Sequence, residues 1–421
     1  MARRKTYGQV GVTGLKKSFM GAINEEFVPK LRNGQAKKVY RQMSDNDPDV
    51  SAFLTLYKAM SMSMPVKVLK SAYDTSDELV DFVESCMEDM STSFQEFRAE
   101  TMSMLVYGYS LFEVVLKKRD REGSRYPDGR IGIAEFAPRA QETIERWVFD
   151  ERGTAVAAIQ RDPDNALEYI IPLHRCAHFR TSSSKNNPEG YSLLRPTYRH
   201  WYFKTQTEEL RGIVMERDAT GIIHVTMPSH LMTNPDGTDS TLRQEVEAKS
   251  MQLSGMYRSS LVTPAEEEGD RVTGINYKTG WSVKQLSSPG KRLVDFNDTI
   301  KMLRNQILTS VSAQFMLLGQ GETGSNALAK SQEESMRMAI DYLHASWCHV
   351  MNHQVMPRLM RLNGYDDPSM WPAFHIDTIK RDLSVEYLNY VKTLTELGYV
   401  APDSDTTHIF KQMLNLPVEK A

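Results

Sequence analysis

The spacing of apolar and polar positions predicts a chain that mixes helices and strands. After the Asp-Pro pair at residues 47–48, apolar residues recur at helical spacing from Val50 to Tyr57, and Asp47 or Asp49 is placed to cap that helix. The segment VKVL that follows the helix alternates as a short strand does. An α+β fold is therefore expected.

A second helical stretch is predicted from about Asp77 to Met104, and Gly108 is expected to end it ahead of a strand. The segment 130–180 contains short runs of β-branched and aromatic residues separated by turn residues. Two strands are predicted around an Asp-Glu-Arg-Gly turn in the sequence ERWVFDERGTAVAAIQRD, and residues 168–181 are predicted as one further strand.

A long amphipathic helix is predicted over residues 193–218, with Pro196 in its first turns. The sequence GIIHVTM after it reads as a strand. Residues 228–290 are mixed, with a predicted helix from Thr241 to Leu261 and strands at RVTGINY and WSVKQL.

The C-terminal part shows two apolar stripes at helical spacing. The stripes consist of Phe296, Ile300, Leu303, Ile307 and Val311, and of Met336, Ile340, Leu343, Trp347 and Val350. Pro357 should kink the second of these helices. Two shorter helices are predicted within residues 379–398 and 405–416.

Between the two stripes, Gly319, Gly321 and Gly324 have the G-x-G-x-x-G spacing of a dinucleotide-binding turn. Such a turn needs a strand before the first glycine and a helix after the third, because the pyrophosphate sits on the helix N-terminus. Here the glycines follow a predicted helix, and no P-loop sequence is present. The pattern therefore favours a polar hinge between two helices, and no cofactor is expected.

Composition narrows the class of protein. The 421 residues are enough for more than one core. The formal net charge of −3 argues against a molecule that grips nucleic acid over its whole surface. No apolar run is long enough to cross a membrane, so no membrane partner is expected. The 3 cysteines are sparse, which indicates a reducing compartment.

Charge is uneven at the start of the chain. Between Met1 and Arg41 only Glu25 and Glu26 oppose a set of basic residues. These are Arg3, Arg4, Lys5, Lys16, Lys17, Lys30, Arg32, Lys37, Lys38 and Arg41. Two interpretations are open, a solvated arm and an arm that touches an anionic partner.

Candidate metal ligands occur in two groups. His174, Cys176 and His178 alternate along a predicted strand and would face one side, and Cys348, His349 and His353 lie together on a predicted helix. No glutamate beside His349 completes a metalloprotease motif, and no catalytic constellation is recognisable. Ordinary core or surface histidines are the simpler interpretation, so neither a metal nor a catalytic site is expected.

Segments spread over most of the chain resemble tailed-bacteriophage portal proteins, in particular the Mu-like portal family. They are VYRQMSDNDPDVSAFLTLYKAMSMSMPVKV, LVYGYSLFEVV, APR at Ala137–Arg139 followed by RWVFD, and NPEGYSLLRPTYRHWYFKTQTEELRGIVMERDATGIIHV. No single segment is diagnostic, and their order along the chain carries the resemblance.

The resemblance implies a subunit of a ring, usually a dodecamer, at one vertex of the capsid. Each subunit would have a wing, a helical stem, a clip and a small helical crown. Carried over by order, the parts are a basic N-terminal arm (1–40), the wing (41–189), a stem helix (190–219), the clip (220–290), a second stem helix (291–318), the channel or tunnel loop (319–330), a wing helix (331–373) and the crown (374–421).

The resemblance to portal proteins also implies binding partners and a location in the virion. The ring would dock the large terminase subunit during genome packaging and the head-tail adaptor and tail afterwards. It would contact major capsid and scaffold proteins and pass double-stranded DNA without sequence specificity, for packaging and later ejection. The protein would be found at the portal vertex of the virion, and in the host cytoplasm during assembly. It would not itself be an enzyme.

The resemblance assigns two sets of site residues. The channel lining would comprise Lys301, Arg304, Gln320, Glu322, Thr323, Ser325, Asn326 and Lys330. The clip would bind partners through Arg243, Lys249 and Arg258. A lining with few cations suits a channel in which DNA slides, since each phosphate contact adds affinity that resists sliding. For Lys301 and Arg304, ordinary solvated helix surface is an equally open interpretation.

Two other classes of function are kept open. A minor head or scaffold protein would assemble without a central channel. A nucleotide-binding enzyme would use the glycine loop at 319–324 and would lose its ligand when Gly321 is replaced by valine.

Overall fold

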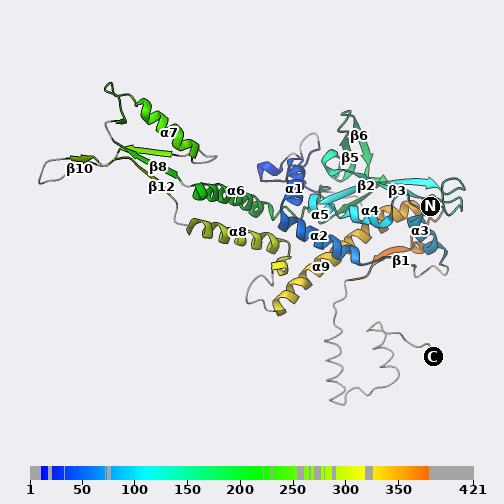
Figure 1. The fold of residues 1–421 in the computed structure, drawn as a ribbon. Helices are drawn as coiled ribbons and strands as arrows, with labels where there is room; N and C mark the ends of the chain where they lie inside the picture. The colour runs from blue at the N-terminus through cyan, green and yellow to red at the C-terminus, as the bar shows by residue number, and fades with distance from the viewer. Residues whose placement is uncertain are drawn as a thin grey trace, which may run out of the picture.

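The computed structural model describes residues 11–378 apart from 18–20, 33, 72, 74–76, 221, 229–230, 254–259, 265–266, 270–275, 279, 287–290 and 318–325. The molecule is elongated (Figure 1). A broad body, built from residues 11–197 and 311–378, continues through two long helices into a small unit at the far end, residues 222–286. We call the two helices the stalk and the far unit the tip.

The body begins with two helices joined at a capped corner. Helix α1 covers Gln35–Asn46 and α2 covers Pro48–Ser63. Between them Asp47 is extended, and its Oδ1 accepts hydrogen bonds from the backbone N–H groups of Asp49 at 2.9 Å and Val50 at 3.2 Å. The cap predicted at this corner is confirmed, and Asp47 provides it.

The prediction of one helix from about Asp77 to Met104 is wrong, because three helices occupy this stretch. They are α3 (Glu78–Glu88), α4 (Phe94–Thr101) and α5 (Met104–Tyr107). Ser93 caps α4 by accepting a hydrogen bond from the backbone N–H of Gln95, so the serine-rich step before it ends one helix and starts another. Gly108 ends α5 with a φ of 92°, as predicted.

Two antiparallel three-stranded sheets form the β-part of the body. The first has the order β3-β2-β7, and the second has the order β4-β5-β6. Their strands are β2 (Tyr109–Lys118), β3 (Ile131–Arg139), β4 (Ile144–Phe149), β5 (Ala155–Arg161), β6 (Glu168–Pro172) and β7 (Cys176–Arg180). A bulge between Val115 and Leu116 breaks the register of β2 with β3. The β-rich character predicted for 130–180 is confirmed.

One strand prediction in this region is wrong. Residues 168–181 form two strands in different sheets, separated by the 3₁₀ helix η3 at Leu173–Arg175. His174 therefore lies in a helical turn and does not share a strand face with Cys176 and His178. Pro172 precedes the turn, and its fixed backbone favours the change of direction.

The C-terminal half of the body returns to the first strand. Helix α9 covers Asn326–Val350, a π-helical turn covers Met351–Val355, and α10 covers Met356–Leu362. The chain then forms β13 (Ala373–Ile376), which pairs antiparallel with β1 (Val66–Leu69). Pro357 was predicted to disturb this helix, and the regular α-helix is interrupted directly before it.

Short 3₁₀ helices complete the described body. They are η1 (Pro29–Leu31), η2 (Gln141–Thr143), η5 (Gln314–Leu317) and η7 (Pro368–Met370).

Aromatic side chains fill the space between the first sheet and α9. Phe97 of α4 stacks on Phe136 of β3 with ring centroids 3.9 Å apart, and Phe179 of β7 stacks on Trp347 of α9 at 5.9 Å. These side chains belong to one large cluster of buried apolar residues that also includes Ile307 of the stalk. The base of the stalk is thus part of the core of the body.

The basic segment at the start of the chain packs on the body. Lys17 lies over the ring of Phe149 at 4.2 Å, and buried Lys37 donates a hydrogen bond to the Ile144 carbonyl at 2.6 Å. Arg32 donates to two backbone carbonyls of its own segment. Burial contradicts the solvated-arm interpretation for Lys37, while Lys17 and Arg32 contact the body and stay exposed. Residues 1–10 lie outside the described part of the chain.

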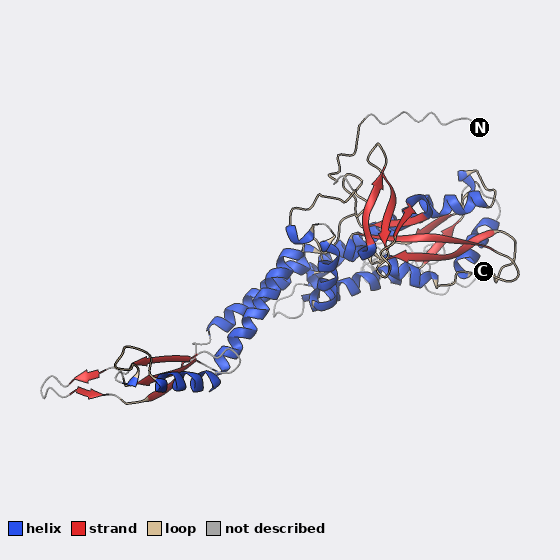
Figure 2. Cartoon of the chain, turned by 90° about the horizontal axis from the view of Figure 1, so that it is seen from above, coloured by secondary structure: helices blue, strands red, loops and turns tan. Residues whose placement is uncertain are grey.

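Two antiparallel helices form the stalk. Helix α6 covers Tyr198–Thr220 and leads outward, and α8 covers Lys291–Ser310 and leads back. Figure 2 shows the pair running side by side from the body to the tip. Pro196 was expected in the first turns of α6, but the helix begins two residues after it, beyond a run of turns.

The tip is a small sheet with one helix beside it. Strand β8 (Ile222–Met227) lies between β12 (Ser282–Leu286), which is antiparallel to it, and β9 (Ser260–Pro264), which is parallel to it. Helix α7 covers Thr241–Leu253, and β10 (Glu267–Gly269) pairs with β11 (Asn276–Lys278).

Two elements predicted in the tip have different bounds in the structure. The predicted helix from Thr241 to Leu261 is too long, because Leu261 belongs to β9. Of the predicted strand RVTGINY, only its end falls in the described strand β11. The two predicted C-terminal helices lie outside the described residues.

We expect Gly108→Ala to lower the free energy of unfolding by more than about 1 kcal/mol, because the backbone there has a positive φ and an added methyl would lie 2.5 Å from the Glu189 carbonyl oxygen. Gly212→Ala, in the open middle of α6, should instead raise it by about 1 kcal/mol. Urea unfolding of both variants checks the pair. Equal effects of the two substitutions would contradict the packing described at Gly108.

Candidate functional site

The stalk projects from the body and gives the molecule its elongated shape. Apolar packing against the body holds its base. With 23 and 20 residues, α6 and α8 are about 35 and 30 Å long at 1.5 Å per residue. Ile300, Leu303 and Ile307 of α8 are buried, as the apolar stripe predicted. Farther out, Arg211 of α6 donates a hydrogen bond to the side chain of Asn297 at 3.1 Å.

A buried cluster of charges joins the stalk to the body. Lys204 of α6 has 2% of its side chain exposed, and its Nζ donates to both Oδ atoms of Asp47, at 3.0 and 2.9 Å, and to Asp49 at 2.5 Å. Arg304 of α8 donates to Asp49 through Nε at 3.0 Å and Nη2 at 2.9 Å. Two carboxylates at the start of α2 thus bind one cation from each stalk helix. We call these four residues the anchor cluster.

The electrostatics of the anchor cluster favour the charged state of Asp49. Burial opposes its ionisation, but hydrogen bonds from Arg304 and Lys204 outweigh burial and hold the pKa of the Asp49 carboxyl below its ordinary value. The hydrogen bonds with Asp49 likewise raise the pKa of Arg304. Because the folded-state pKa of Asp49 is depressed, its contribution to stability is present at neutral pH and is lost in acid.

The outer part of the stalk is covered on one side only. Phe203, Leu210 and Met215 of α6 are 48%, 53% and 52% exposed, and Met302 of α8 is 51% exposed. Phe203 and Leu210 are seven residues apart and share a helix face. A row of large apolar side chains on a helix surface is typical of a surface that another protein covers.

The predicted channel residues fall partly in the described chain. Lys301 lies on the exposed face of α8, and Arg304 lies on the same helix but is bound to Asp49. Gln320, Glu322, Thr323 and Ser325 lie outside the described residues. Asn326 and Lys330 begin α9, whose first side chains are not described. The assignment of these residues to a channel stays a prediction.

The predicted clip residues lie in the tip. Arg243 of α7 is half-buried and bonds to Asp239, while Lys249 is exposed on the same helix. Arg258 falls among residues 254–259, which the structure leaves undescribed. Partner binding by these side chains likewise stays a prediction.

The histidine groups behave as core and surface residues. His178 is buried, burial lowers its pKa to about 3, and its Nε2 lies 2.8 Å from the Pro188 carbonyl oxygen. His349 and His353 stack with ring centroids 4.0 Å apart on an exposed face. Within the described ranges, no group of three or more histidine, cysteine, aspartate or glutamate residues is arranged to hold a metal ion.

The surroundings of the glycine loop do not match a dinucleotide site. The described residues before it are helical, in α8 and η5, and α9 begins at Asn326. A dinucleotide turn follows a strand. The described helices also include none that is long and apolar enough to span a membrane.

Comparison with known proteins agrees with this geometry. Residues 37–412 match the family described as the portal protein of Mu bacteriophage. The chain belongs to that family. No curated protein matches the chain.

Solved structures share the fold of this portal-family chain. A chain from the neck of an empty GTA particle, computed with C6 symmetry, has a TM-score of 0.55 and 12% sequence identity, with 91% of this chain and 94% of that chain covered. A chain from the neck of a native GTA particle, computed with C12 symmetry, has a TM-score of 0.54 and 12% identity, with 94% and 97% covered. At this identity the likeness shows the fold alone.

The anchor cluster of this portal-family chain was not found from the sequence. Its signal is nevertheless present, because Lys204 follows Tyr198 and Trp201 at three-residue steps on the buried face of α6. A lysine on an apolar stripe needs a buried carboxylate. Asp47 and Asp49 were identified only as caps.

We expect Lys204→Ala to lower the free energy of unfolding by about 3–5 kcal/mol, because it leaves two carboxylates buried with one cation. Lys301→Ala, on the exposed face of α8, should change it by no more than about 0.5 kcal/mol. Urea unfolding at neutral pH measures both.

The loss caused by Lys204→Ala should shrink as the pH falls and the Asp49 carboxylate takes up a proton. A small loss at neutral pH, equal to that of the Lys301 variant, would show that the cluster does not hold the stalk.

Proposed function

We propose that the chain is the subunit of a ring-shaped portal with a central DNA channel, through which the genome is packaged and later leaves the capsid. The observation that carries the proposal is the family match over residues 37–412 together with the shape of the chain. In this assignment the body is the wing, the stalk is the stem and the tip is the clip. Most of the predicted crown (374–421) falls among the residues that are not described, and its first residues, up to Ile376, belong to β13 of the body.

The apolar surface of the stalk supports a ring. Each subunit of a closed ring meets two neighbours through different surfaces. The exposed side chains Phe203, Leu210 and Met215 on α6 and Met302 on α8 would be covered by the stalks of neighbouring copies. The C6 and C12 symmetries with which the two GTA neck structures were computed favour the same arrangement, with twelve subunits as the expected number.

The exposed face of α8 suits a channel wall. It carries Asp298, Lys301 and Asn305, one anion, one cation and one amide. The charge of Arg304 on the same helix is offset by Asp49. With no net positive charge, such a wall would exert little attraction on phosphates and would let DNA slide. The loop predicted from the sequence at 319–330 would then border the passage next to this wall.

The proposed partners follow from the ends of the subunit. The tip would dock the large terminase subunit during packaging and the head-tail adaptor afterwards, with Arg243, Lys249 and Arg258 as contacts. The wing would meet the capsid and scaffold proteins. The motor would supply the energy, and the portal itself would catalyse no reaction. The protein would occupy the portal vertex of the virion after assembly in the host cytoplasm.

Electron microscopy of the purified chain tests the central claim. Class averages of the wild-type chain should show rings with a central hole wide enough for duplex DNA. Leu210→Asp should convert rings to single subunits, because it places a carboxylate in the apolar contact between stalks. Asn305→Asp adds the same charge at an exposed polar position of α8, on the proposed channel wall, and should leave rings intact.

Rings without a hole would favour a minor head protein without a pore. Rings that survive Leu210→Asp would show that the stalk surface is not the contact between subunits.

Removal of residues 321–325 should leave rings intact and reduce the amount of DNA packaged per head. The physical reason is that a loop next to moving DNA affects its passage and not the contacts between subunits. The measurement is the nuclease-protected DNA in heads assembled with the variant as their portal. Replacement of the same residues by an equal number of glycines and serines is the control and should preserve packaging. Failure of rings to form would contradict the assignment of this loop to the channel.

A further inference from the structure

A groove at the end of the body, away from the stalk, has no assigned occupant. It is a cavity of about 890 Å³ between the C-terminal ends of α2 and α3 and the start of α4. Its apolar lining comes from Met62, Val66, Met87, Met90 and Phe94, all of them half-buried. Methionine side chains are adaptable and fit the shape of an incoming apolar surface.

A buried arginine, Arg98, lines the same groove and has no carboxylate partner among the described residues, because Glu88, which also lines the groove, is bound to the Tyr126 hydroxyl. Arg98 of α4 is 4% exposed and donates hydrogen bonds to the backbone carbonyls of Ser61, at 2.6 Å, and Met64. No carboxylate of the described residues forms an ion pair with Arg98, and burial lowers the pKa of its guanidinium. A buried charge without a counter-ion is costly, so the groove favours an occupant that carries a carboxylate.

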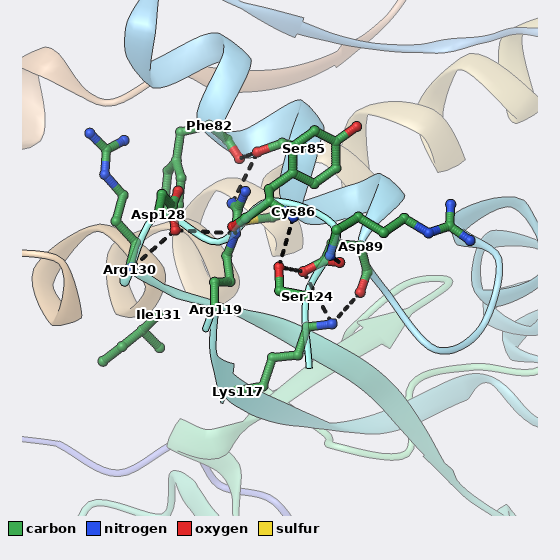
Figure 3. A network of polar contacts seen from close by, with 12 residues as sticks. Phe82, Ser85, Cys86, Asp89, Lys117, Arg119, Ser124, Asp128, Arg130 and Ile131 are labelled. Atoms are coloured by element: carbon green, nitrogen blue, oxygen red, sulfur yellow. Dashed lines mark hydrogen bonds and ion pairs between the residues drawn. The ribbon is translucent and has the colours of Figure 1, made fainter. Parts of the chain in front are cut away.

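The wall of the groove opposite α2 is held in place by a polar network (Figure 3). Buried Asp89 accepts hydrogen bonds from the Ser124 hydroxyl at 2.6 Å and the Arg125 backbone N–H at 2.9 Å, and it pairs with Lys117 at 3.1 Å. These contacts fix the loop between β2 and β3, whose Arg125 lines the groove.

Arg119 fastens the other side of this loop. It donates to the Ser85 hydroxyl at 3.0 Å and to the Cys86 sulfur at 3.4 Å, both in α3 (Figure 3). The groove is therefore preformed, which lowers the entropic cost of filling it.

The C-terminal segment leaves the body beside this groove. In the pairing of β1 with β13, Ile376 lies opposite Val66, and Val66 lines the groove. Only Asp377 and Thr378 separate Ile376 from residues 379–421. A segment attached this close has a high effective concentration at the groove without any spanning linker.

The sequence of this segment complements the groove. Leu383, Tyr387, Val391 and Leu394 recur at helical spacing and make one apolar stripe, and Glu386 lies next to that stripe on a helical projection. The segment therefore offers an apolar face that matches the methionine lining and an adjacent carboxylate that could pair with Arg98.

We propose that residues 379–397 of the same chain form an amphipathic helix that fills this groove, with the apolar stripe on the methionines and Glu386 paired with Arg98. A helix of this length is about 28 Å long. The inference does not depend on the proposed portal function, because it concerns one chain and its own C-terminal segment.

Methionine oxidation tests the proposal on the full chain. The wild-type chain is treated with hydrogen peroxide at a concentration where gel filtration shows single subunits, and oxidation of each methionine is followed by peptide mass spectrometry. Leu383→Asp with Tyr387→Asp should speed oxidation of Met62, Met87 and Met90 several-fold. Met338 on α9, which is 64% exposed, should oxidise at the same rate in every sample.

Matched variants separate docking from a general effect of charge. Asn389→Asp with Thr393→Asp adds the same charge outside the apolar stripe and should leave the three rates unchanged. Glu386→Gln should raise them, while Glu396→Gln, on the far side of the same helical projection, should not.

Two results would overturn the proposal. One is equal oxidation of the three methionines in all variants, which would mean that the segment does not cover them. The other is protection found only in oligomeric fractions, which would assign the groove to the segment of a second copy.

Discussion

The arrangement of this chain depends on the buried ion cluster at the root of the stalk. Two helices carry the tip away from the body, and apolar packing alone would allow them to slide or tilt, because it has little directional preference. Lys204 and Arg304 instead reach a pair of carboxylates on α2 whose positions are set by the start of that helix. Asp47 binds the lysine and caps α2 at once, so the same atoms define a helix end and the direction of the stalk. The cluster holds two anions and two cations, and their mutual attraction offsets the cost of desolvating each ion.

Much of the local structure could be predicted from the sequence, and the errors have physical causes. Periodicity identified the buried stripe of α8 because that helix is apolar on one face only. The Asp-Pro pair marked the start of α2, and Gly108 marked the end of α5. Residues 168–181 were misread because two consecutive strand-like runs belong to different sheets, and only tertiary contacts show that a turn separates them. One helix was predicted before Met104 where two occur, because Ser93 starts a new helix while the spacing of the apolar residues stays helical on both sides of it.

The candidate site was less accessible to sequence reasoning. Exposed apolar residues such as Leu210 are indistinguishable from core residues until the fold shows that no described residue of the chain covers them. Arg304 was assigned as possible channel surface, yet its Nε and Nη2 donate hydrogen bonds to Asp49, 255 residues earlier in the chain. A long-range pair of this kind leaves no local pattern. The family resemblance, in contrast, rests on the order of many segments and therefore survives errors in any one of them.

The π-helical turn at Met351–Val355 has a consequence for comparing this chain with its relatives. A π turn holds more residues than an α turn, and one extra residue rotates everything after it by about 100°. The buried positions accordingly pass from Trp347 and Val350 to Val355 and Leu359, one residue later than an unbroken helix would place them. Asn352 uses the irregular turn to exchange two hydrogen bonds with the backbone of Phe374 in β13. A helical periodicity carried unbroken through 326–362 would therefore assign surface positions to the interior after the turn. Buried positions in relatives should be assigned separately for the helices before and after the π turn.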